Sequence, residues 1–408
     1  MSSSLDPTLA TVVAPVGSGR VLVAVDGLSN VAAGPMALRI EGHLRERFPG
    51  HEVTVGVTTC ESGEISLRRE LSAAPAFRAP SLALSGVEGQ HSALRAVLEE
   101  AVWTSARVVA LVSAEAHDDS ADWLGTLLGP ILDGGFDFVS PAYLRHKGDA
   151  AINTGIVYPL TRALYGRRLR QPLGGEAALS LPLATRLLED ADWGRDPATA
   201  GSDGWLVAKV LATETRACQA WLGAWPRPDG PTEDPSQTLA RILGMLFREM
   251  ERHAARWQRV EGSAPLPTFG EPGLLDGGPQ PPIDRFVAAF QLGERELASL
   301  WGLVLSPGAR VALRRAAAVP ERFRLDDATW ARIVYDFAVA HFARLVERRQ
   351  LLLSMTPLYL GWAASFAAET HGLDVKAIED RVEQLCRAFE QQKRYLISRW
   401  RWPDSFNP

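Results

Sequence analysis

The chain has 408 residues and a formal net charge of −5 at pH 7. This length exceeds the size at which a single hydrophobic core stops growing, so we expect two domains. The acidic balance argues against general nucleic-acid binding. No run of about 18 or more apolar residues occurs, so we expect no helix that spans a membrane.

The N-terminus lacks a basic start followed by an apolar block, so residues 1–17 are predicted to be a disordered leader and not a signal peptide. Three cysteines are scattered along the chain: Cys60, Cys218 and Cys386. They form neither a disulfide framework nor a metal cluster, which fits a reducing cytoplasm as the location of the protein.

Short apolar runs in the first half of the chain are typical of strands that are buried on both faces. They cover residues 21–26, 53–59, 108–113 and 136–143. Helical patterns lie between them, at residues 35–47 and 92–100. This alternation predicts an α/β domain with a mainly parallel sheet. Such sheets bind ligands at the carboxyl ends of their strands, where we expect Asp26, Ser113 and residues 138–180.

A proline-rich and acidic segment without periodicity, residues 226–235, interrupts the pattern. After a longer Pro/Gly-rich loop at residues 263–283, the sequence is helical almost to its end. One apolar face consists of Trp330, Ile333, Val334, Phe337 and Phe342, and another of Ile378, Val382, Leu385 and Phe389. We therefore expect an α/β domain at residues 18–225 and an all-helical C-terminal domain at residues 236–408. The apolar faces fit a core and also fit a homodimer interface, and the sequence does not separate the two.

Residues 138–180 concentrate positive charge in this acidic chain. The basic residues of this segment are Arg145, His146, Lys147, Arg162, Arg167, Arg168 and Arg170. A basic cluster of this kind usually needs an anionic partner. Paired glycines, Gly174 and Gly175, precede the carboxylate of Glu176 and indicate close approach of the backbone to a ligand. We interpret this segment as the main functional part of the chain.

The same segment resembles the glucosylglycerate and mannosylglycerate synthase type of glycosyltransferase. The matching residues are Tyr143, Arg145-His146-Lys147, Asp149, Ile156 to Gly166, Arg167-Arg168 and Gln171 to Glu176. The resemblance extends over most of the chain and is weaker before residue 100. It implies a GT-A nucleotide-sugar domain, Rossmann-like with a mainly parallel sheet, followed by helices. It also implies transfer of a hexose from a GDP-glucose or GDP-mannose type of donor to a small carboxylate such as D-glycerate.

The resemblance assigns the acceptor side to one short region. Arg145 offers a planar guanidinium that matches a carboxylate in a bidentate pair. Asp149, Asn153 and Thr154 are expected to hold the acceptor's hydroxyl groups. Asp203 is expected near the reaction centre or against the acceptor, with an N-cap of the following helix as its alternative role.

The donor is expected to be bound by Asp26, Gln90, Ser113 and Glu115. Glu176 is expected, with Asp203, to be a catalytic residue, and its carboxylate is expected to lie against the hexose hydroxyls. Asp26 fits contact with the nucleotide base or ribose, and equally a turn cap. Family members carry an Asp-x-Asp motif that holds a divalent cation, Mg²⁺ or Mn²⁺, whereas this chain has Ser113-Ala114-Glu115.

Glu115 is therefore the expected metal ligand. The alternative is that Glu115 belongs to a solvated loop that binds no ligand. Arg227 stands where the resemblance places a histidine ligand, and it fits either direct charge neutralisation or a surface position.

These departures leave three functional hypotheses. The first is an active hexosyltransferase that binds a nucleotide sugar and a small anionic acceptor. The second is a catalytically impaired GT-A homologue that acts as a nucleotide-sugar binding or regulatory protein. The third is a transferase with a changed donor, because the changes gather on the nucleotide side.

Overall fold

The structure is a computed structural model, and it describes residues 19–26, 33–61, 64–68, 82–83, 88–113, 122–144, 152–190, 193, 202–224, 235–272, 281–318 and 323–403. The predicted leader lies outside these residues. The chain divides into two compact units. The first comprises Met1–Leu144, Leu173–Gly230 and Pro265–Leu274, and the second comprises Arg145–Pro172, Pro231–Ala264 and Leu275–Pro408.

The first unit contains a nine-stranded sheet with the order β11-β9-β6-β8-β5-β1-β2-β3-β4. Its strands are β1 (Arg20–Asp26), β2 (Glu52–Glu61), β3 (Glu64–Arg68), β4 (Leu82–Ala83), β5 (Val108–Ser113), β6 (Phe138–Leu144), β8 (Ala177–Ser180), β9 (Ala217–Ala224) and β11 (Thr268–Phe269). β1 pairs in parallel with β2 and β5, and β9 pairs in parallel with β6 and β11. β8 runs antiparallel between β5 and β6.

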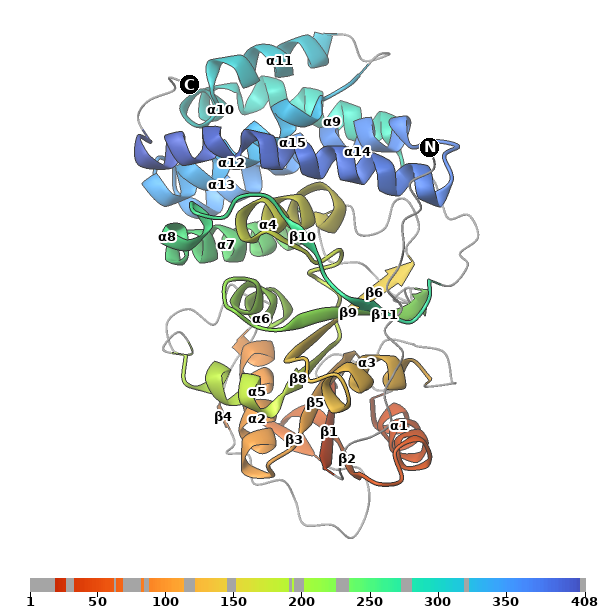
Figure 1. Cartoon of the computed structure of the whole chain (residues 1–408). Coiled ribbons are helices and arrows are strands. Elements are labelled where there is room, and N and C mark those ends of the chain that lie inside the picture. Colours follow the sequence, from red (N-terminus) through yellow and green to blue (C-terminus); the bar gives the residue numbers. More distant parts are fainter. Residues whose placement is uncertain are drawn as a thin grey trace. The chain divides into compact units, whose positions relative to one another are not determined.

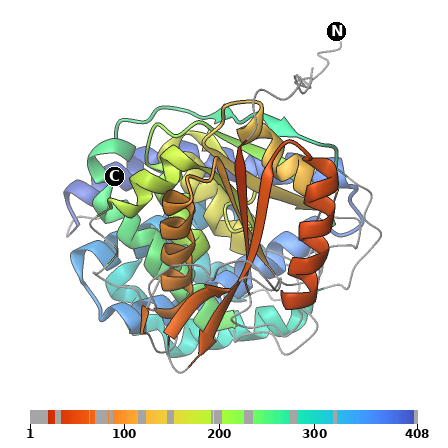
Figure 2. The same ribbon diagram turned by 90° about the horizontal axis from the view of Figure 1, so that it is seen from below.

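Helices cover both faces of this sheet, as Figures 1 and 2 show. They are α1 (Ala33–Arg47), α2 (Glu88–Trp103), α3 (Trp123–Leu132), α5 (Leu181–Leu188) and α6 (Ser202–Leu211). Successive side chains of a strand point to opposite faces. Val21, Val23 and Val25 accordingly pack with α1 and α3, whereas Leu22 and Ala24 pack with α2. The two apolar layers bury the strands on both sides.

The predicted fold class, α/β with a mainly parallel sheet followed by helices, is confirmed by this topology. Each predicted strand is present, with ends shifted by at most a few residues. The helices predicted at residues 35–47 and 92–100 correspond to α1 and α2. β8 has no counterpart in the prediction because it is only four residues long.

The second unit is helical. It contains the π-helix η1 (Asn153–Val157) and the α-helices α4 (Tyr158–Tyr165), α7 (Pro235–Arg252), α8 (Ala254–Trp257), α9 (Ile283–Glu296), α10 (Ala298–Val304), α11 (Pro307–Ala318), α12 (Asp327–Ala343), α13 (Arg348–Ser354), α14 (Thr356–Glu369) and α15 (Val375–Arg401). Two short strands, β7 (Arg167–Arg168) and β10 (Ala264–Pro265), pair with each other. Side chains of Asp326 and Asp374 cap the N-termini of α12 and α15 by accepting backbone N–H hydrogen bonds.

The predicted apolar faces of α12 and α15 are largely core. Trp330, Val334 and Phe337 are fully buried. Phe342 departs from this prediction, because 38% of its surface is exposed and its ring stacks on that of Trp400. A homodimer interface remains a prediction.

The helical unit includes residues 145–172, which precede β8 in the chain. Helix α4 packs against α15, so this part of the basic segment clusters with the C-terminal helices. One segment of the unit, Arg348–Glu369, is long and apolar enough to cross a membrane by length and composition alone. Because 67% of its most apolar window is buried within the protein, as in a core helix, it does not establish a membrane span.

Candidate functional site at the carboxyl edge of the sheet

Asp26, Thr58 and Ser113 lie in a row across three neighbouring strands. Asp26 is the Cα partner of Thr58 on β2 and of Ser113 on β5. The hydroxyl of Thr58 donates a hydrogen bond to Oδ1 of Asp26 over 3.2 Å. β1 and β5 both end here, and ligands of open α/β sheets bind beyond such carboxyl ends. The row therefore brings two of the predicted donor-side residues, Asp26 and Ser113, together.

Glu176 reaches the same edge from the opposite chain direction. It directly precedes β8, whose first residue, Ala177, pairs with Leu111 on the antiparallel neighbour β5. Gly175 before it has φ = 85°, a left-handed conformation that non-glycine residues rarely adopt. The backbone conformation of the turn therefore requires glycine at position 175. This requirement is a second reason for glycine here, besides the predicted close approach to a ligand.

The carboxylate of Glu176 accepts a hydrogen bond from the hydroxyl of Tyr143, with 2.5 Å between Oη and Oε2. Both residues are buried, with 2% and 4% of their surfaces exposed. The ring of Tyr143 belongs to an apolar cluster that includes Val139 and Ala178. The hydrogen bond from Tyr143 therefore anchors the carboxyl group of Glu176 to the core of the sheet.

Sequence reasoning named Tyr143 only as part of the family pattern and not as the partner of Glu176. The two residues are 33 positions apart. The only signal was that a buried carboxylate at a strand end needs a donor, and this does not identify which donor supplies the bond.

Glu115, Arg145, Asp149 and Arg227 lie outside the described residues. Gln90 lies in the first turn of α2 and Asp203 in the first turn of α6, but the placement of their side chains also lies outside the described part. Their roles remain predictions.

Asn153 and Thr154 belong to the helical unit, at the start of η1. Asn153 is buried and Thr154 is half-buried. The next residue, Gly155, is held by Nε1 of Trp330, which donates to its carbonyl oxygen over 2.8 Å. A Cβ atom at Gly155 would lie 2.2 Å from the ring of Trp362, so this position accepts only glycine. The π-helical turn is thus built into the tryptophan-rich core of the unit, and acceptor binding there remains a prediction.

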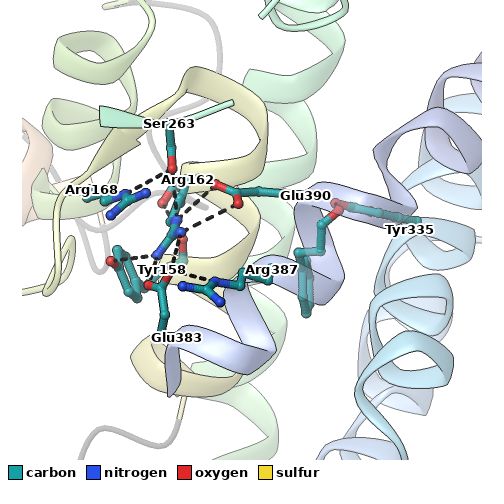
Figure 3. A network of polar contacts seen from close by, with 10 residues as sticks. Tyr158, Arg162, Arg168, Ser263, Tyr335, Glu383, Arg387 and Glu390 are labelled. Carbon is teal, nitrogen blue, oxygen red and sulfur yellow. Dashed lines mark hydrogen bonds and ion pairs between the residues drawn. The ribbon is translucent and has the colours of Figure 1, made fainter. Parts of the chain in front are cut away.

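Arginines of the basic segment have partners within the helical unit. Figure 3 shows Arg162 between two glutamates of α15, Glu383 and Glu390. Nη2 of Arg162 donates to Glu383 over 3.0 Å and Nε donates to Glu390 over 2.9 Å, while only 1% of the arginine side chain is exposed. Hydrogen bonds from Arg162 hold the pKa of Glu383 down at about 2, far below its ordinary value. We call Arg162, Glu383 and Glu390 the arginine lock.

Two further arginines extend the arginine lock. Arg170 forms two hydrogen bonds with Glu379, of 2.9 and 2.8 Å. Nε of Arg168 donates to the hydroxyl of Ser263 over 3.0 Å, and Nε of Arg162 reaches the same hydroxyl. The anionic partner that this part of the segment needed is therefore largely the chain's own C-terminal helix.

The sheet edge offers oxygen ligands of the type that a divalent cation prefers. Asp26 contributes a carboxylate, and Thr58 and Ser113 contribute hydroxyls beside it. Mg²⁺ is usually held by one or two carboxylates together with substrate phosphates and water. Within the described ranges, no three His, Cys, Asp or Glu side chains are grouped closely enough to hold a metal ion without other ligands. The donor set therefore fits a cation shared with a bound diphosphate.

Comparison with known proteins gives matches among solved structures only. One is glucosyl-3-phosphoglycerate synthase from Mycobacterium tuberculosis in complex with Mn²⁺, UDP and phosphoglyceric acid; the TM-score is 0.38 at 18% identity, over 58% of this chain and 78% of that one. Another is the mannosyltransferase PcManGT from Pyrobaculum calidifontis in complex with GDP-Man and Mn²⁺, with a TM-score of 0.33 at 15% identity over 96% of this chain and 90% of that one. No protein-family model and no curated protein matches the sequence.

Proposed function

We propose that this protein is a hexosyltransferase of the GT-A type. It transfers a hexose from a nucleotide sugar, of the GDP-glucose or GDP-mannose type, to a small carboxylate such as D-glycerate. The observation that carries the proposal is the anchored carboxylate of Glu176 on the sheet edge that also presents Asp26 and Ser113. The sequence resemblance supplies the substrate class.

On the donor side, Glu176 accepts hydrogen bonds from hexose hydroxyls. A carboxylate has about four acceptor positions, so one such group can accept from sugar hydroxyls as well as from Tyr143. Asp26 contacts the ribose or base, and Gln90 lies on the nucleotide side. Asp203 acts near the reaction centre.

On the acceptor side, Arg145 binds the acceptor carboxylate in a bidentate pair, which fixes its plane as well as its position. Asp149, Asn153 and Thr154 bind the acceptor hydroxyls. Orientation of this kind matters because the attacking hydroxyl must be aligned with the sugar for transfer.

The leaving nucleoside diphosphate gains negative charge as the bond to the hexose breaks, and this charge must be neutralised. Glu115, with Ser113 beside it, would hold a Mg²⁺ or Mn²⁺ ion, which when bound supplies that neutralisation. Arg227 offers positive charge from the chain itself.

The test is transfer of hexose from GDP-glucose and GDP-mannose to D-glycerate, with and without Mg²⁺ or Mn²⁺, followed by mass spectrometry of the product. We expect turnover by the intact chain, and a loss of about 100-fold in kcat/KM for Glu176→Gln, which keeps the shape and removes the charge. Absence of product from folded protein under every metal condition would contradict the proposal.

Ser113 favours a second candidate. Where the resemblance calls for a carboxylate, β5 ends in a neutral hydroxyl, which weakens cation binding. The alternative is a nucleotide-sugar binding or regulatory protein without turnover. Calorimetry with GDP separates the two: metal-independent binding without product supports the alternative, and metal-dependent binding with product supports the enzyme. A panel of UDP-, GDP- and ADP-sugars tests whether the donor has changed.

A further inference from the structure

We propose that Tyr143 is a positioning residue that sets the orientation of the Glu176 carboxylate toward the hexose of the donor. This inference rests on the proposed role of Glu176 and adds to it the residue that makes the carboxylate a fixed acceptor. It concerns only the first unit, because both side chains belong to it.

The backbone at Glu176 is already fixed from both sides. β8 pairs with β5 through Ala177 and with β6 through Ala178, so the strand that directly follows Glu176 has a neighbour on each edge. The turn before it holds Gly175 in the left-handed region. What the backbone leaves open is the direction of the long, flexible glutamate side chain, which otherwise occupies several rotamers.

The hydrogen bond from Tyr143 restricts that freedom. The ring of Tyr143 is 2% exposed and packs in the apolar cluster of the sheet, so the hydroxyl at its tip has a fixed position. The 2.5 Å hydrogen bond to Oε2 ties one carboxylate oxygen to that point. A site is effective when the side chains that touch the ligand are themselves held by buried neighbours. Tyr143 is such a neighbour, and Glu176 is the group that touches the sugar.

This arrangement predicts that the nucleotide part and the hexose part of the donor contribute to affinity independently. The nucleotide part of the donor contacts other residues, so its binding does not depend on the direction of Glu176. The hexose part does depend on it, because its hydroxyls need the carboxylate in one orientation. Loss of the Tyr143 hydroxyl should therefore reduce the affinity gained from the hexose and leave the affinity for the free nucleotide unchanged.

The experiment compares Tyr143→Phe, Glu176→Gln and the double variant. The ratio of the Kd of the nucleoside diphosphate to that of its hexose conjugate is measured by calorimetry with GDP- and UDP-hexoses, together with kcat/KM. We expect Tyr143→Phe to reduce kcat/KM by about 10- to 100-fold, a range typical of misplaced reacting groups, and to abolish the hexose gain in affinity. Within the Glu176→Gln background, the same change should alter both quantities by less than about twofold, because coupled residues are non-additive.

Tyr335→Phe is the matched control. Its hydroxyl is also buried and donates over 2.8 Å to the carbonyl oxygen of Phe389, within the helical unit. We expect this variant to be less stable but to keep the increase in affinity that the hexose provides over the free nucleotide. Equal losses from Tyr143→Phe in both backgrounds, or an equal loss of free-nucleotide affinity, would reduce Tyr143 to a structural residue and overturn the inference.

The two proposals fail separately. Hexose-dependent binding without product overturns the transferase and keeps the positioning role of Tyr143. Product formation with unchanged activity in Tyr143→Phe overturns the positioning role and keeps the transferase. If the intact chain binds none of the nucleotide sugars more tightly than the nucleotides, Glu176 has no hexose to orient and the inference is wrong.

Discussion

The sheet edge and the arginine lock each contain a buried ionisable side chain, Glu176 and Arg162, and the two differ in what that side chain contacts. At the edge, the hydroxyl of Tyr143 donates a hydrogen bond to the carboxylate of Glu176 beside the ends of parallel strands. In the lock, the N–H groups of the buried Arg162 donate to two glutamates and also to the hydroxyls of Ser263 and Tyr158. The first cluster fits the orientation of a ligand, whereas the second joins α4 to α15. In the sequence, the arginines at positions 162 and 170 suggested a binding site for an anion, whereas in the structure they pair with glutamates of α15.

The largest effect that sharpens this comparison is expected for Arg162→Ala. Removing one partner of a buried ion pair leaves the others without compensation, which typically costs about 3–5 kcal/mol. The measurement is chemical denaturation followed by a probe of the helical unit.

Arg387→Ala is the control for Arg162→Ala, because Arg387 also contacts Glu383 but is 65% exposed. Exposed pairs of this spacing are worth about 0.3–0.5 kcal/mol. Equal destabilisation by the two variants would mean that the arginine lock contributes no more than a surface ion pair.

A smaller effect on the free energy of unfolding is expected when the pH is lowered. The folded-state pKa of Glu383 is about 2, below its ordinary value of 4.5. The stability that its ion pair contributes is therefore fully present above about pH 4.5 and is lost as the pH falls toward 2. We expect the unfolding free energy of Glu383→Gln to depend less steeply on pH across this window than that of the unchanged chain. Parallel pH curves for the two proteins would contradict the assignment.

The smallest effect is expected at the rim of the lock. Arg170 pairs with Glu379, whose side chain is 52% exposed, so water screens the pair. Arg170→Ala should cost about 0–1 kcal/mol in unfolding free energy, measured by the same denaturation. A loss of several kcal/mol would place Arg170 among the residues on which folding depends.

Four strands of the α/β unit, β1, β2, β5 and β6, were predictable because buried strands are continuous apolar runs, as in residues 21–26 and 108–113. The strands β3, β4, β9 and β11 were not predicted from the sequence. β8 was not predictable, since four residues with small side chains carry no periodic signal. Its antiparallel insertion is what brings Glu176 to the edge.

Polar partners that are far apart in the chain could not be predicted from the sequence either. Arg162 and Glu383 are 221 positions apart, and both lie in helical stretches where ion pairs with many residues are equally plausible. Gly175 shows the same limit on a local scale: the sequence marks a glycine, and only the φ angle of 85° shows that the turn requires it. Asp26 and Ser113 were placed correctly at one edge because strand direction follows from the α/β alternation alone.

The most direct test of the account is to measure kcat/KM for hexose transfer in Glu176→Gln and Arg170→Gln side by side. Both substitutions remove one charge from the same short segment, one at the sheet edge and one beside the arginine lock. We predict a loss of about 100-fold for Glu176→Gln and a change of less than about twofold for Arg170→Gln. The reverse result, with activity dependent on Arg170 and indifferent to Glu176, would show that the basic segment and not the sheet edge carries the chemistry.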